Sequence, residues 1–277
     1  MLEMCEAFTI NYRSRRQSYF VSEEELPMFR CIAETLQDEI HATWKRPSRM
    51  LKLLRPNKIS NVVRRSLMRA KIENSWQREG GFEMRAYNTY NDYIKHQQSK
   101  LDLMELQLET YDIEYRSWLR ERLLRLPVEW AGKSVLCLAA RIGTEVKAFI
   151  DVGAFAVGID LNPGKGNSYV VSGDFHNLQF APRSVDVVFT NSLDHAFDLK
   201  RLMAQVKRVL KLDGLFVTEI SVGRSHGAMP GTHESFFWSK PEDLIEFLAT
   251  TGFELSGRTP FAYPSQGEQL LFRPKRF

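Results

Sequence analysis

The feature that most constrains the fold of this chain is an alternation of short apolar runs and helical patterns that begins after Pro127. Apolar runs at residues 134–139 and 154–160 flank a helical pattern at about 143–152. Short continuous apolar runs are typical of strands buried on both faces of a parallel sheet, with helices as the crossover connections. The alternation therefore predicts an α/β fold.

The alternation continues to the C-terminus. Further strands are expected at 169–172, 185–190, 215–220, 253–257 and 268–272, and further helices at 199–210 and 241–250. Pro241 with Glu242 and Asp243 beside it is a typical helix start, because proline suits the first turn and acids favour the positive end of the helix dipole. We expect a Rossmann-like, seven-stranded, mostly parallel sheet with one antiparallel edge strand and helices on both faces.

The first part of the chain has a different pattern. Helical spacing of apolar residues is found at 27–43, 61–76 and 90–126. We therefore predict a mostly helical N-terminal region over residues 1–128 and the α/β domain over residues 129–277.

Positive charge is concentrated in residues 41–80. This segment holds eleven Lys or Arg against two Glu, whereas the whole chain has a net charge of only +4. Three interpretations remain open: a solvated helical face, adhesion to an anionic membrane surface, and binding of RNA. Trp44 and Met50 among the charges suit the membrane interpretation, and no RNA-binding motif is recognisable.

Cysteine usage and hydropathy point to a cytoplasmic protein. Cys5, Cys31 and Cys137 match no zinc or redox spacing. No apolar run reaches the roughly 18 residues that span a bilayer, and the N-terminus carries acids where a secretory signal would be basic. We expect a reducing cytoplasmic setting, with peripheral attachment to a membrane as the alternative.

Candidate ligand-binding residues come after four successive strands, and ligands of parallel sheets bind beyond the carboxyl ends of the strands. Small residues after the first strand would let the backbone approach a ligand, and an acid after the second could accept hydrogen bonds from a ribose diol. An acid and an aromatic ring after the third would suit an adenine. The candidates are Ala139, Ala140, Arg141, Gly143 and Glu145, then Asp160 and Leu161, then Gly173, Asp174 and Phe175, and finally Asn191, Asp194 and His195.

Together these stretches resemble class I S-adenosylmethionine-dependent methyltransferases, particularly the group that includes small-molecule and glycan methyltransferases. Residues 199–219 are similar to that group's helix, V-L-K-P-G-G turn and strand, and residues 238–244 with 251–253 look like its late helix. The resemblance covers about 145 residues. It implies S-adenosylmethionine as cofactor and methyl transfer as activity.

The resemblance also implies roles for the strand-end residues. Residues 139–143 would hold the methionine portion of the cofactor, with Glu145 near its ammonium. Asp160 would bind the ribose hydroxyls, Asp174 would meet the adenine amine, and Phe175 would pack on the ring. The remaining strand-end candidates up to Asn191 would complete the cofactor site.

The loop after the first strand departs from the family pattern. Cys137 stands where the family has an acid, Ala139 and Arg141 replace glycines, and Gly143 is the only glycine left. Alanine fits the loop if its φ stays negative, whereas Arg141 is expected to reach a carboxylate or to point to solvent. The G-x-G-x-x-G pattern of nicotinamide-binding domains is also absent.

The residues after the fourth strand indicate the kind of acceptor group. His195 is a candidate general base, oriented by Asp194 or Asp198, although a histidine there could simply cap a loop. His226 and His233 are too weak a pattern for a metal site, so none is predicted. The Asn/Asp-Pro-Pro-Tyr motif of base-amine methyltransferases is missing.

We therefore expect O-methylation of a hydroxyl on a small molecule or glycan. The alternatives are an RNA-directed methyltransferase and a non-catalytic binding or scaffold protein that keeps the fold.

Overall fold

The computed structural model describes residues 76–275, with the backbone alone over 101–110. The helix predicted at 27–43 and nearly all of the basic segment 41–80 lie outside the described residues. Of the helix predicted at 61–76 only Trp76 is described, and it lies in a strand. No helix among the described residues is long and apolar enough to cross a membrane.

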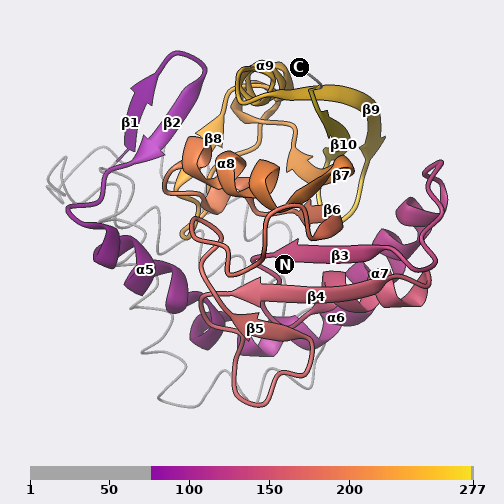
Figure 1. Ribbon diagram of the computed structural model, residues 1–277. Coiled ribbons are helices and arrows are strands. Elements are labelled where there is room, and N and C mark those ends of the chain that lie inside the picture. Colours follow the sequence, from indigo (N-terminus) through magenta and orange to yellow (C-terminus); the bar gives the residue numbers. More distant parts are fainter. Residues whose placement is uncertain (1–75, 276–277) are drawn as a thin grey trace, which may run out of the picture. The chain divides into compact units, whose positions relative to one another are not determined.

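A seven-stranded sheet forms the centre of the described structure, with strand order β5-β4-β3-β6-β7-β10-β9 (Figure 1). The strands are β3 (Ser134–Leu138), β4 (Phe155–Asp160), β5 (Val170–Ser172), β6 (Val185–Thr190), β7 (Leu210–Ser221), β9 (Phe253–Phe261) and β10 (Gly267–Pro274). The first five of these pair in parallel, which confirms the predicted α/β class.

The antiparallel strand is not at the edge of the sheet, where the sequence pattern predicts it. β10 pairs antiparallel with β7 on one side and with β9 on the other, so that β9 forms the edge. The reason is that the connection between β9 and β10 is too short for a crossover, so β10 must return beside β9. It thereby fills the position next to β7.

Helices cover both faces of the sheet, as predicted. α8 (Leu199–Val209) and α9 (Pro241–Thr250) pack on one face, and α7 (Thr144–Asp151) with α6 (Lys100–Leu124) on the other. Successive residues of one strand alternate between the two cores: Leu136 faces α8 and α9, whereas Cys137 faces α6 and α7. This alternation is the period-two pattern of a strand buried on both sides.

The helical pattern predicted at 90–126 is divided into two helices, α5 (Tyr90–Gln98) and α6. The Ser99 hydroxyl between them donates a hydrogen bond of 2.7 Å to the carbonyl of His96, and such back-bonding bends helices. α6 also packs on the sheet, so that α5, α6 and the sheet share one compact unit, Ser75–Phe277.

A small antiparallel sheet lies beside the main one, with strand order β1-β2-β8. It consists of β1 (Trp76–Glu79), β2 (Phe82–Arg85) and β8 (Phe236–Trp238). β8 is buried, with Trp238 only 2% exposed. Just before β8, the Ser235 amide donates a hydrogen bond to the Asp194 carbonyl, which holds the segment after β7 close to the end of β6.

Candidate functional site

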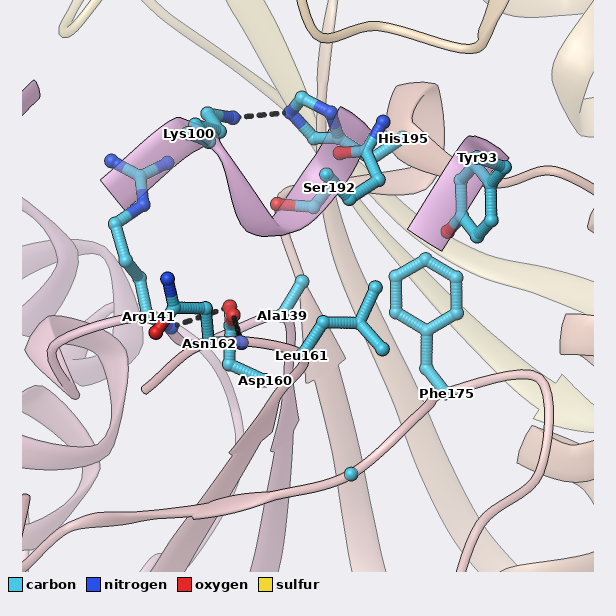
Figure 2. Close-up of a pocket in the computed structure, with 12 residues that line it drawn as sticks. Tyr93, Lys100, Ala139, Arg141, Asp160, Leu161, Asn162, Phe175, Ser192 and His195 are labelled. Carbon is cyan, nitrogen blue, oxygen red and sulfur yellow. Dashed lines mark hydrogen bonds between the residues drawn. The ribbon is translucent and has the colours of Figure 1, made fainter. Parts of the chain in front are cut away.

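A pocket lies at the carboxyl ends of the parallel strands and is closed from above by α5 and the start of α6 (Figure 2). The space between its walls is about 510 Å³, open solvent included. Seven of the residues predicted from the strand ends line it: Ala139, Arg141, Asp160, Leu161, Gly173, Phe175 and His195. Five lining residues were not predicted: Tyr93, Gln97, Lys100, Asn162 and Ser192.

The loop after β3 has the positive φ angles of a glycine-rich loop, although Gly143 is its only glycine. Ala139 has a φ of 52° and Arg141 a φ of 43°, both in the left-handed region, so Ala139 does not keep the negative φ at which alanine fits without strain. This conformation costs a non-glycine residue roughly 1–2 kcal/mol. Gly143, with a φ of 84°, cannot carry a side chain, since a Cβ would lie 2.7 Å from the Cβ of Tyr169.

Asp160 holds this loop against the end of β4. Its two carboxylate oxygens accept hydrogen bonds from the amide of Arg141 at 2.9 Å and from that of Asn162 at 2.8 Å. An ionised carboxylate has about four acceptor positions, so Asp160 can accept further hydrogen bonds. It lines the pocket, where those positions suit the two hydroxyls of a ribose.

Asp174 and Phe175, which follow β5, differ in their relation to the pocket. Phe175 lines the pocket and is 7% exposed. Asp174 is not among the lining residues: it accepts hydrogen bonds from the Tyr90 hydroxyl and, at 2.8 Å, from the amide of His176. Its predicted contact with an adenine amine therefore has a competitor in Tyr90.

Three of the unpredicted residues of the pocket come from α5 and the start of α6. Tyr93 and Gln97 are four residues apart on α5, which places them on one face of that helix, and Lys100 is the first residue of α6. Gln97 is fixed to the segment after β7, because its amide donates to the His233 carbonyl at 2.7 Å. The helical spacing is visible in the sequence, but the surface that this face covers is not.

The half-buried Lys100 and the buried His195 form a pair at one end of the pocket (Figure 2). The Nζ of Lys100 lies 2.6 Å from Nε2 of His195, and Nδ1 of His195 lies 2.8 Å from the His233 carbonyl oxygen. Since a carbonyl only accepts, Nδ1 carries the proton and Nε2 is the acceptor. Burial lowers the pKa of Lys100 to about 8, with Arg141 adding to the effect, and lowers that of His195 as well.

Two carboxylates lie next to this pair without lining the pocket. Oxygens of Asp194 and Glu234 and a nitrogen of His195 lie within 4.8 Å of one another, a spacing that a metal ion could bridge. Burial and the charge of Glu234 raise the pKa of Asp194 to about 7. His195 is oriented by the His233 carbonyl rather than by Asp194, whose Oδ1 is 3.8 Å from Nε2.

Two other residues considered for the catalytic site, Asp198 and His226, do not line the pocket. Asp198 caps α8 by accepting from the amide of Arg201 at 2.9 Å, and so does not orient His195. His226 lies exposed in a turn outside the pocket.

Glu145 and Asn191 belong to a buried polar network behind the loop, on the side of α6. The Asn191 amide donates to Glu145 at 3.0 Å and to the Tyr115 hydroxyl at 2.9 Å. Burial raises the pKa of Glu145 to about 7. Neither residue lines the pocket, and the same holds for Ala140 and Gly143, which shape the loop from behind.

Comparison with known proteins gives the class. Residues 136–218 match the model of a methyltransferase domain family. The fold is shared with the 1,6-didemethyltoxoflavin-N1-methyltransferase of Burkholderia thailandensis, solved with S-adenosylhomocysteine: identity is 14% and TM-score 0.55, covering 73% of this chain and 100% of that one. It is also shared with a putative methyltransferase of Haloferax volcanii in complex with the activator Trm112, at 17% identity, TM-score 0.51, and 64% and 98% coverage. No curated protein matches the sequence.

The sheet order and the shared structures thus show the fold of class I methyltransferases, with the pocket at the carboxyl ends of its parallel strands. Residues 136–218 match the methyltransferase domain family, and S-adenosylmethionine is the cofactor that this domain implies. The class, the fold and the cofactor predicted from the sequence are confirmed.

Proposed function

We propose that the protein transfers the methyl group of S-adenosylmethionine to a hydroxyl group of a small molecule or glycan, and that Lys100 and His195 together accept the hydroxyl proton. The observation that carries this proposal is the pair of basic side chains that line the pocket, with Lys100 Nζ 2.6 Å from His195 Nε2.

The residues that line the pocket can be assigned to the ribose, the base and the methionine portion of the cofactor. Asp160 would hold the ribose, since its carboxylate keeps unused acceptor positions. Leu161 and Phe175 would pack on the base, and the loop at Ala139 and Arg141 would contact the methionine portion. The guanidinium of Arg141 has the charge to meet the methionine carboxylate.

S-adenosylmethionine would supply an electrophilic methyl carbon, which would form a bond to the acceptor oxygen while the electron pair of the broken carbon–sulfur bond stays on sulfur. The protein then has to position the acceptor in line and remove one proton. His195 holds Lys100 by accepting its hydrogen bond, because the His233 carbonyl fixes the proton of the imidazole on Nδ1. When Lys100 is neutral, the pair can take up the acceptor proton and retain it as the Lys100 ammonium.

Methylation of a nitrogen is the second candidate. The toxoflavin enzyme with which this chain shares its fold is an N-methyltransferase by its name. An amine or ring nitrogen could lose its proton to the same pair, so the pair does not choose between oxygen and nitrogen. Binding of an anionic membrane or of RNA through residues 41–80 stays a prediction.

The proposal is tested by methyl transfer from S-[methyl-³H]adenosylmethionine to a panel of small hydroxyl and amine compounds, with products identified by mass spectrometry. We expect His195→Asn and Lys100→Met to lose at least about tenfold in rate, as removal of general-base catalysis does. Both variants should still bind S-adenosylhomocysteine.

The matched control is His226→Asn, which changes an exposed histidine outside the pocket and should keep the wild-type rate. A product methylated on nitrogen would replace the hydroxyl acceptor by the second candidate. Wild-type rates in both His195→Asn and Lys100→Met would contradict the role of the pair.

A further inference from the structure

The hydroxyl of Tyr93 is a buried polar group that no described residue pairs with. Tyr93 lies on α5, is 0% exposed, and its hydroxyl has no hydrogen bond to any described residue. Leaving a buried hydroxyl unpaired is unfavourable, and native proteins rarely do so without a reason. Since Tyr93 lines the pocket, a ligand in that pocket is the available partner.

We propose that Tyr93 forms the hydrogen bond that recognises the polar edge of the cofactor's adenine, in place of Asp174. This inference rests on the proposed placement of the cofactor, with Asp160 at the ribose and Phe175 at the base. Tyr93 lies outside residues 136–218, the part of the chain that the family model matches.

The surroundings of the Tyr93 hydroxyl suit a purine. Figure 2 shows Tyr93 facing the ring of Phe175, with the Leu161 side chain beside them, so this end of the pocket is aromatic and apolar. Such walls bind the flat face of a base, and a single polar group in them fixes its orientation. The charged residues Arg141 and Lys100 are at the other end of the pocket (Figure 2).

Aromatic packing holds Tyr93 in one orientation. Its ring centre lies 5.3 Å from those of Tyr90 and Phe197 and 5.6 Å from that of His176. The hydroxyl is therefore pre-positioned, and binding a ligand would cost little side-chain entropy.

Asp174, the residue predicted to bind the adenine amine, already accepts hydrogen bonds from other residues of the protein. Asp174 accepts from Tyr90 and from the amide of His176, and it does not line the pocket. α5 thus supplies both residues in this arrangement: Tyr90 holds Asp174, and Tyr93 faces the pocket one helical turn further along. Burial and nearby acids raise the pKa of Tyr93, which keeps the phenol neutral and able to donate to a ring nitrogen.

The test is the affinity of Tyr93→Phe for S-adenosylhomocysteine and for methylthioadenosine, measured by calorimetry, together with the melting temperature of the free protein. Both ligands carry the base, so we expect each to bind about five- to tenfold more weakly, the effect of one lost hydrogen bond. The free variant should melt no lower than the wild type, because the hydroxyl it loses has no hydrogen-bond partner among the described residues. Tyr263→Phe, outside the pocket, is the control and should bind like the wild type.

Affinities within twofold of the wild type for both ligands would overturn the inference. So would a free Tyr93→Phe protein that is clearly less stable or fails to fold, because the hydroxyl would then have a structural role. A wild type that binds neither ligand would overturn the cofactor placement as well, which distinguishes failure of the proposed function from failure at Tyr93 alone.

Discussion

The ion pair between Arg122 and Glu219 should be the most sensitive point in the stability of the described structure, because it joins α6 to the sheet in the interior. Two parallel hydrogen bonds of 2.6 and 2.8 Å connect the guanidinium to the carboxylate. The Tyr115 hydroxyl at 2.8 Å and the Gln269 amide at 2.9 Å also donate to Glu219. The two paired side chains are only 9% and 2% exposed.

The burial of the pair sets the expected magnitude. Arg122→Met removes the cation and leaves the Glu219 carboxylate buried with two neutral donors. Removing one partner of a buried ion pair typically costs about 3–5 kcal/mol, whereas replacing both by apolar residues is often close to neutral. We therefore expect Arg122→Met to lower the free energy of unfolding by about 3–5 kcal/mol, and the double variant Arg122→Met with Glu219→Leu to recover a large part of it.

Urea unfolding monitored by circular dichroism measures these differences. The same helix offers a matched control: Arg116 also makes a 2.6 Å pair, with Asp151, but the two side chains are 39% and 27% exposed. Arg116→Met should cost only about 0–1 kcal/mol, as exposed pairs do. Equal losses in Arg116→Met and Arg122→Met, or a loss below about 1.5 kcal/mol for Arg122→Met, would refute the reasoning.

Three further predictions concern pH and packing. Burial raises the pKa of Glu145 to about 7 from an ordinary value near 4.5, so its contribution to stability is present below pH 4.5 and is lost as the pH rises towards 7. Glu145→Gln should therefore be more stable than the wild type at pH 8, by up to about 3 kcal/mol, and no more stable at pH 4.5. Identical urea midpoints of variant and wild type at both pH values would refute this. Because the neutral form of Lys100 is the base and its pKa is about 8, the rate of methyl transfer should rise with pH through 8 and level off above it; a flat profile between pH 7 and 9 would contradict the role of this lysine. Gly158→Ala should cost about 1–3 kcal/mol, the usual effect of overpacking, since its Cβ would lie 2.7 Å from Cβ of Ala140 and 2.9 Å from Cγ2 of Val170; an unchanged urea midpoint would argue against such close packing.

The sequence predicted those parts of the site that depend on sheet topology. Parallel strands bring their carboxyl ends to one edge, so that Asp160, Phe175 and His195 could be assigned to one pocket from their positions after three successive strands. The antiparallel β10 was misplaced because only the short turn before it, and no local propensity, decides which neighbour it takes.

Long-range packing accounts for the parts that the sequence did not predict. Lys100 and His195 are 95 residues apart, and no local pattern indicates that the start of α6 reaches the end of β6. Tyr90 and Asp174, which are joined by a hydrogen bond, are likewise 84 residues apart. The positive φ at Ala139 opposes the ordinary preference of alanine, and only the surrounding structure can impose it.

The central claim is that the strand ends form one cofactor site in which Asp160 binds the ribose. Calorimetry of S-adenosylhomocysteine with wild type, Asp160→Asn and Asp174→Asn tests it most directly. We predict one-to-one binding by the wild type, binding at least about tenfold weaker in Asp160→Asn through the lost charge-assisted hydrogen bonds, and a change within about threefold in Asp174→Asn, as expected for a residue that makes no hydrogen bond to the ligand. No heat from the wild type, or equal affinities of wild type and Asp160→Asn, would contradict the account.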